Sequence, residues 1–112
     1  MSESNNQRVA AVQMEPRLGR LIENLETVLA RLVEAASAGA RLVVFPECAL
    51  SGYGFSSREE GLAHSVEASG AELGRIAEVC SQRDVHGILG LLERDGDRLY
   101  NASALVGPKG VV

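Results

Sequence analysis

Hydrophobic positions along this chain follow two patterns, short unbroken runs and stripes at helical spacing. Val9–Val12 and Leu42–Phe45 are unbroken apolar runs, which are typical of strands covered on both faces. Between them, apolar residues recur at helical spacing from Leu21 to Ala36, and Gly39 is placed to end that helix in the left-handed conformation. These segments predict a right-handed parallel βαβ unit.

The second half of the chain predicts another helix followed by a hairpin. Ser69–Glu72 has the spacing of a capping box, and the apolar stripe after it extends to Cys80. Two strands are predicted, over His86–Arg94 and Leu99–Val106, with Asp95-Gly96 as the turn between them. Loops are predicted at Ser51–Ser57 and Gly107–Gly110, and Val111-Val112 is predicted to begin a further strand.

Length and composition restrict the class of protein. The chain has 112 residues and a formal net charge of −4, which argues against a nucleic-acid or membrane partner. No apolar run approaches the roughly 20 residues of a membrane helix, and the two cysteines do not form a secreted disulfide framework, so we expect a cytoplasmic protein. Met1–Gln7 is a polar leader, and a strand that opens at the last residues indicates the N-terminal part of a longer α/β fold.

One acidic residue is a candidate for catalysis because of its place in this pattern. Ligands of open α/β sheets bind beyond the carboxyl ends of the strands, and Glu47 follows the second predicted strand there. Phe45, Pro46 and Tyr53 are its expected neighbours, and partial desolvation by them would suit a general base. The alternative reading of Glu47 is a surface acid or a helix cap.

The other candidate side chains favour structural roles. Cys48 neighbours Glu47, but adjacent side chains of an extended chain point to opposite faces, so a buried thiol is expected. Cys80 lies on an apolar helical stripe and is expected in the core. His64 and His86 have no partner at metal-ligand spacing, and Lys109, the only lysine, occupies a turn. No metal site is predicted.

Several segments occur together in a characteristic order. They are Arg8–Met14, Asn24, Leu42–Tyr53, Gly87–Gly90, Tyr100–Leu105 and Gly107–Gly110. The most specific of them holds Phe45-Pro46-Glu47 and, after a short interval, Ser51-Gly52-Tyr53. Together the segments resemble the N-terminal part of the nitrilase, or carbon–nitrogen hydrolase, superfamily.

The resemblance implies an α/β fold that is the N-terminal part of a four-layer αββα sandwich with a mixed sheet. It also implies a Glu-Lys-Cys triad in which Glu47 is the general base, with Tyr53 as a candidate substrate-binding residue. Such a triad hydrolyses non-peptide carbon–nitrogen bonds of small-molecule amide, carbamoyl or nitrile substrates through a thioester. The resemblance implies no metal or organic cofactor. It also implies that the protein forms a homo-oligomer.

This chain departs from the family pattern, because the family's lysine and cysteine would follow Val112. Lys109 precedes the lysine position, and neither Cys48 nor Cys80 matches the nucleophile. Residues 8–112 are therefore expected to be a partial hydrolase domain, cut before the Lys and Cys and inactive in isolation. The alternative is a truncated, non-catalytic fragment that acts only by association through an uncovered sheet face. An unrelated flavodoxin-like domain is disfavoured by the predicted hairpin.

Overall fold

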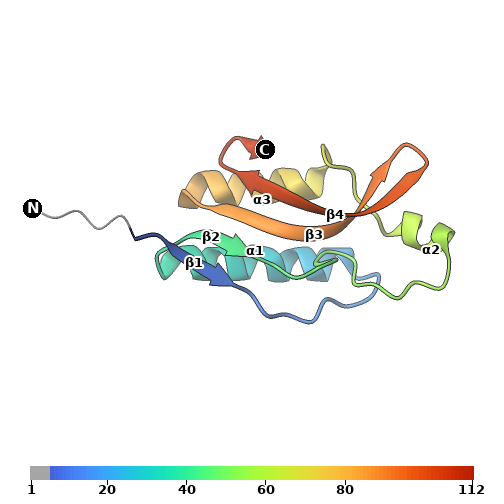
Figure 1. The fold of residues 1–112 in the computed structure, drawn as a ribbon, viewed down its shortest axis with the longest axis horizontal. Coiled ribbons are helices and arrows are strands. Elements are labelled where there is room, and N and C mark those ends of the chain that lie inside the picture. The colour runs from blue at the N-terminus through green and yellow to red at the C-terminus, as the bar shows by residue number, and fades with distance from the viewer. Residues whose placement is uncertain (1–5) are drawn as a thin grey trace, which may run out of the picture.

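The strands of this chain lie in one mixed sheet in the order β1-β2-β3-β4-β5 (Figure 1). The computed structural model describes residues 6–112, so most of the predicted leader, residues 1–5, lies outside the described residues. The strands are β1 (Arg8–Ala11), β2 (Ala40–Val44), β3 (His86–Asp95), β4 (Arg98–Gly107) and β5 (Gly110–Val111). β1, β2 and β3 are parallel, whereas β4 and β5 each pair antiparallel with the strand before. The predicted βαβ unit and hairpin are therefore confirmed.

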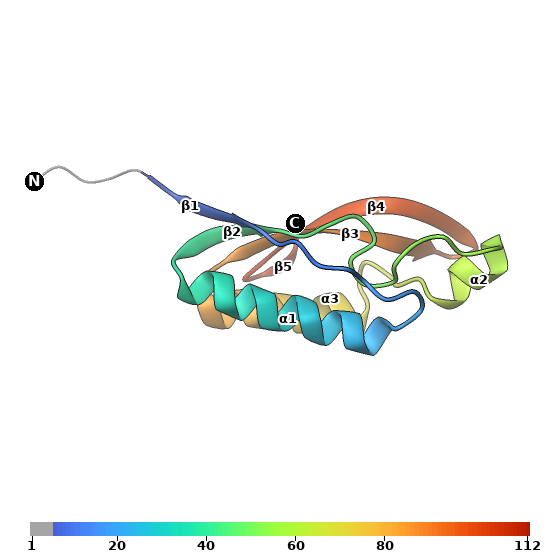
Figure 2. The same ribbon diagram turned by 90° about the horizontal axis from the view of Figure 1, so that it is seen from below.

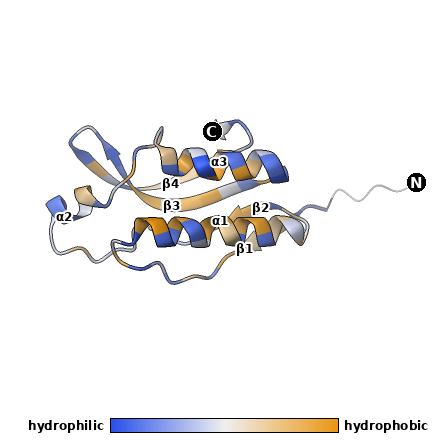
Figure 3. Cartoon of the chain, turned by 180° about the vertical axis from the view of Figure 1, so that it is seen from behind, coloured by the Kyte–Doolittle hydropathy of each residue, from blue (hydrophilic) through white to orange (hydrophobic). Residues whose placement is uncertain are grey.

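The long helices α1 (Leu21–Ser37) and α3 (Ala71–Arg83) lie side by side on one face of the sheet (Figure 2). Their apolar residues pack against the strands and form the core. Figure 3 shows hydrophobic and hydrophilic residues interspersed along both helices. The core residues with no exposed surface are Val28, Leu32, Val43, Cys80, Val85, Leu89 and Val106, among others. Each buried side chain of this size contributes about 1.5–3 kcal/mol, so this contact holds the two helices on the sheet. None of the described helices is long and apolar enough to cross a membrane.

Two local predictions need correction, and one short helix was not predicted. The N-cap of α3 is Gly70, and no side chain caps this helix, so Ser69 does not form the expected capping box. Asp95 is still paired with Arg98, which places the hairpin turn at Gly96 and Asp97, with Gly96 at a φ of 63°. The short helix α2 (Arg58–Ala63) was not predicted, although the hydroxyl of its N-cap Ser57 accepts from the backbone N–H of Glu60.

The sheet face opposite α1 and α3 is covered by no described element (Figure 2). Alternate residues of the strands point to this face, and it is largely apolar. Val9 is 67% exposed, Val44 39% and Leu105 37%. The prediction that the first two strands are covered on both faces is therefore wrong for the described chain.

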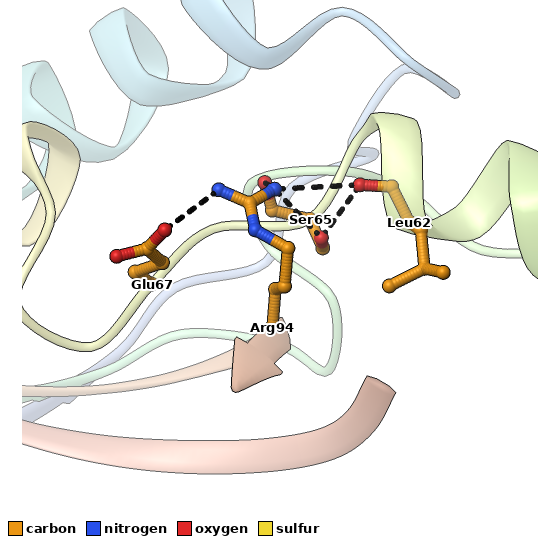
Figure 4. Close-up of polar contacts among 4 residues, drawn as sticks. All are labelled: Leu62, Ser65, Glu67 and Arg94. Carbon is orange, nitrogen blue, oxygen red and sulfur yellow. Dashed lines mark hydrogen bonds and ion pairs between the residues drawn. The ribbon is translucent and has the colours of Figure 1, made fainter. Parts of the chain in front are cut away.

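Past the end of β2, another segment pairs with the edge of β3. Val66 receives a 2.7 Å hydrogen bond from the backbone N–H of Arg94 and donates one to the carbonyl of Leu92. The guanidinium of Arg94 then donates to the carbonyls of Leu62 and Ser65 and to the Ser65 hydroxyl, and it pairs with Glu67 at 3.2 Å (Figure 4). One side chain thus fastens the whole 62–67 segment to the sheet.

We expect Arg94→Met to destabilise the fold by about 1–3 kcal/mol, because it removes the hydrogen bonds from a partly buried guanidinium to Ser65 and Glu67. The matched control is Arg75→Met, which removes only an exposed ion pair with Glu26 and should cost at most about 1 kcal/mol. Urea unfolding of both variants checks the difference. Equal losses of stability would contradict a special role for Arg94.

Candidate functional site

The segment that carries Glu47 continues the pairing of β2 along the edge of β3. The backbone N–H of Phe45 donates to Ile88 at 2.8 Å, that of Gly90 donates to Pro46 at 3.2 Å, and that of Ala49 donates to Gly90 at 2.8 Å. These bonds bracket Glu47 on both sides. The backbone of the candidate residue is thus held by the central strand of the sheet, beyond the carboxyl end of β2 as predicted.

Gly90 allows this segment to come close. A Cβ at that position would lie 2.5 Å from the Glu47 Cα and 2.7 Å from the Cys48 nitrogen, distances that side chains do not tolerate. The neighbouring atoms belong to the backbone, so they cannot rotate away. Because Gly90 has no side chain, the Glu47 backbone can pack directly against β3.

Asn24 anchors the loop on its other side. This buried residue of α1 donates from Nδ2 to the carbonyls of Leu50 and Arg17, and its Oδ1 accepts from the Arg17 N–H. The carbonyl of Ser51 accepts a further bond of 2.8 Å from Gly19. One amide therefore joins the loop after β1 to the loop after β2, the two loops that surround the candidate site.

The carboxylate of Glu47 is exposed and accepts a 2.5 Å hydrogen bond at Oε1 from Nδ2 of Asn101 on β4. No described residue bonds to Oε2, and no ion pair of the described residues includes Glu47. Glu47 itself is exposed and Tyr53 is 72% exposed, so the described chain does not provide the partial desolvation expected at this carboxylate.

Two open hollows flank the Glu47 carboxylate. One, of about 410 Å³, is lined by Val44, Ile88, Asn101 and Ser103, among others. The other, of about 330 Å³, is lined by Glu15, Pro46 and Tyr53, so the two candidate residues of the sequence share a hollow. Glu47 lies between a neutral, partly apolar pocket on the uncovered sheet face and a second pocket at the loop after β1.

Cys48 is not placed to act as a nucleophile. It is 1% exposed and adopts a left-handed turn with a φ of 49°, while the Glu47 side chain is exposed. Burial raises the pKa of the Cys48 thiol, and the neighbouring Glu47 carboxylate adds to the rise against an opposing hydrogen bond from Ser51. The prediction of a buried thiol is confirmed, and Cys48 remains protonated at neutral pH.

The other residues singled out in the sequence lie away from Glu47. Cys80 is a buried residue of α3, and burial raises the pKa of its thiol. His64 stacks on Phe55 with ring centroids 5.4 Å apart, and the His86 ring packs against Gly107. Lys109 is in the turn before β5, as predicted. Within residues 6–112, no group of three or more His, Cys, Asp or Glu side chains could hold a metal ion.

Two contacts of Glu47 were not assigned by sequence reasoning. Asn101 and Gly90 each fall in a segment of the family resemblance, yet neither received a role. The register of the β3–β4 ladder brings Gly90 and Asn101 to Glu47. In that register Gly90 pairs with Ser103, and Asn101 pairs with Leu92 two residues along β3. The sequence offered one signal for these contacts, a glycine in one predicted strand of the hairpin, Gly90, and an asparagine in the other, Asn101.

Comparison with known proteins gives a consistent likeness. The sequence profile of the family described as carbon-nitrogen hydrolase matches residues 8–112. A nitrilase of Pyrococcus abyssi is 36% identical over 107 residues, covering 94% of this chain and 40% of that protein. Nitrilase 3 of Arabidopsis thaliana is 33% identical over 123 residues, covering 96% of this chain and 36% of that protein. The chain thus spans about two fifths of the length of these relatives.

Solved structures show the same fold. The crystal structure of an N-terminal amidase superposes with a TM-score of 0.78 at 22% identity, over 93% of this chain and 26% of that one. An amidase from Nesterenkonia sp. gives a TM-score of 0.72 at 20% identity, over 95% of this chain and 40% of that one. The predicted fold class, the N-terminal part of an αββα sandwich with a mixed sheet, is confirmed.

We expect Gly90→Ala to destabilise the fold by about 1–3 kcal/mol, because the new Cβ must push the Glu47 and Cys48 backbone away from β3. Backbone amide resonances of residues 47–49 should shift with it in NMR spectra. Gly74→Ala is the matched control, since Gly74 lies in α3 with nothing within 4 Å and alanine there should stabilise by about 0.5–1 kcal/mol. A Gly90→Ala chain with unchanged stability and unchanged resonances would refute the packing argument.

Proposed function

This chain belongs to the carbon–nitrogen hydrolase family, and we propose that it supplies the general base, Glu47, for hydrolysis of a non-peptide carbon–nitrogen bond. The substrate class is a small-molecule amide, carbamoyl compound or nitrile, and Tyr53 contributes to its binding site. The proposal is supported chiefly by the Glu47 carboxylate, which borders a hollow at the end of β2 with one oxygen held and the other unbonded among the described residues.

The chemistry we propose is that of a Glu-Lys-Cys thiol hydrolase. The Glu47 carboxylate accepts the proton of a cysteine thiol, and the thiolate attacks the electrophilic carbon of the substrate. A lysine stabilises the charge that develops on the attacked group, the proton taken by Glu47 passes to the departing ammonia or amine, and water then cleaves the thioester. With a nitrile, the first adduct is a thioimidate, to which a water adds before ammonia leaves. The lysine and the cysteine are not among these 112 residues, because Lys109 lies in the turn before β5 and both cysteines are buried thiols.

We expect the 112-residue chain to release no ammonia from amides or nitriles. The protein encoded by the complete reading frame that contains these residues should do so, and Glu47→Gln should lower its kcat/KM by about 10²–10⁴-fold, the usual contribution of a general base. Glu78→Gln, at an exposed site on α3, is the control and should leave turnover unchanged. Turnover by the 112-residue chain, or full activity of Glu47→Gln, would overturn the proposal.

Association alone is a second candidate role, favoured by the uncovered apolar face of the sheet. Val44 and Leu105 belong to this face and keep more than a third of their surface exposed. Contiguous apolar surface of this kind marks an interaction site in soluble proteins. A homo-oligomer formed through this face is the form of association we propose.

Sedimentation of the 112-residue chain should show concentration-dependent self-association. Leu105→Lys should shift it towards monomer, because the mutation places a charge in the contact. Ile22→Lys, at an exposed apolar site on α1, is the matched control and should leave the distribution unchanged. A monomeric wild-type chain at all concentrations would count against this role.

A further inference from the structure

We propose that Asn101 is the positioning residue for the Glu47 carboxylate, holding one oxygen so that the other is directed to receive a proton. The inference rests on the proposed function of Glu47. It is based on a contact between residues far apart in the sequence. Asn101 on β4 is 54 positions from Glu47, and its Nδ2 donates a hydrogen bond to the Glu47 Oε1 at 2.5 Å. A charge-assisted bond of this kind is about twice as strong as a neutral one.

Glu47 needs such a partner because nothing else in the described chain orders its side chain. The residue is exposed, and confining a free glutamate to one conformation costs rotamer entropy. Every ion pair of the described residues lies elsewhere, so no cation competes for the carboxylate. The amide of Asn101 is therefore the group that selects the rotamer.

The orientation of the Asn101 amide is fixed from its other end. The Cys48 thiol donates to Oδ1 at 3.9 Å, and burial keeps this thiol protonated, so it stays a donor. Reversing the amide would place Oδ1 against the Glu47 carboxylate and the NH₂ group against the thiol hydrogen. Asn101 thus joins the buried Cys48 to the exposed Glu47, and both contacts demand the same orientation.

The residue type also matches the task. An arginine at this position would hold the carboxylate more firmly but would favour its charged form and weaken it as a base. An aspartate would repel it, and a serine is shorter. The amide neither gives up nor takes a proton at neutral pH, so it orients the base without entering the proton transfer.

The β3–β4 hairpin supplies the rigidity that a positioning residue requires. Asn101 lies opposite Leu92 in a ladder that runs without interruption from Gly87 to Asp95. Gly90, in the same strand as Leu92, carries the backbone of the Glu47 loop. The hairpin therefore holds both the main chain and the carboxylate of the base.

The test reads this contact in the 112-residue chain by NMR, without relying on turnover. In the wild-type chain, we expect the Asn101 side-chain amide resonances to shift when Glu47 is replaced by Ala, and the three-bond couplings of Glu47 to report one χ1 rotamer. Asn101→Ala should average those couplings, while Ser103→Ala should not. Ser103 is the matched control because it lines the same hollow two residues along β4 and makes no bond to Glu47.

Unmoved Asn101 resonances in Glu47→Ala, or identical Glu47 couplings in wild type and Asn101→Ala, would overturn the inference. Glu47→Ala reads the contact from the other side, so the test survives a failure of Asn101→Ala to fold. In the protein of the complete reading frame, Asn101→Ala should lower kcat with little change in KM. If Glu47→Gln abolishes turnover there but the NMR contact is absent, the inference fails while the proposed function stands.

Discussion

The close approach of the Pro46–Cys48 backbone to Gly90 is the constraint on which the rest of the site depends. Because Gly90 has no side chain, the chain leaving β2 stays hydrogen-bonded to β3 and then turns sharply at Cys48. That turn sends the Cys48 side chain into the interior and leaves the preceding side chain, Glu47, exposed at the edge of a hollow. It also brings Leu50 within reach of Asn24, which ties in the loop after β1. The missing Cβ at Gly90 thus sets the backbone position of the candidate base and of the loops around it.

Much of this arrangement could be predicted from local sequence, because the determinants are local. Two apolar runs separated by one amphipathic helix allow only a parallel βαβ unit in practice, and that unit places Glu47 beyond the carboxyl end of β2. Burial of Cys48 followed from the difference in side-chain direction between adjacent residues, although the actual backbone is a left-handed turn and not an extended strand.

The remaining features depend on pairing between distant segments, which no local pattern contains. Asn101 meets Glu47 only because the β3–β4 register sets it opposite Leu92, and a turn placed one residue away, as the sequence indicated, would change that register. In the sequence, Arg94 likewise is an ordinary charged residue of a predicted strand. Its role depends on the 62–67 segment, which is distant in sequence and packs on β3 in the structure. The exposure of β1 was missed because an apolar run does not reveal which of its faces this chain covers.

The uncovered sheet face and the candidate base, Glu47, are physically linked because they share lining residues. Val44 and Ile88 contribute to the apolar face and also line the hollow beside Glu47. Any surface that buries these side chains therefore also removes water from the carboxylate, because the same strands carry both. The hydrophobic effect would then drive the association that supplies the desolvation a general base needs. Until that face is covered, the Glu47 carboxylate is hydrogen-bonded to Asn101 but exposed to water. Its position is set by this chain, and its environment is set by whatever packs on the sheet.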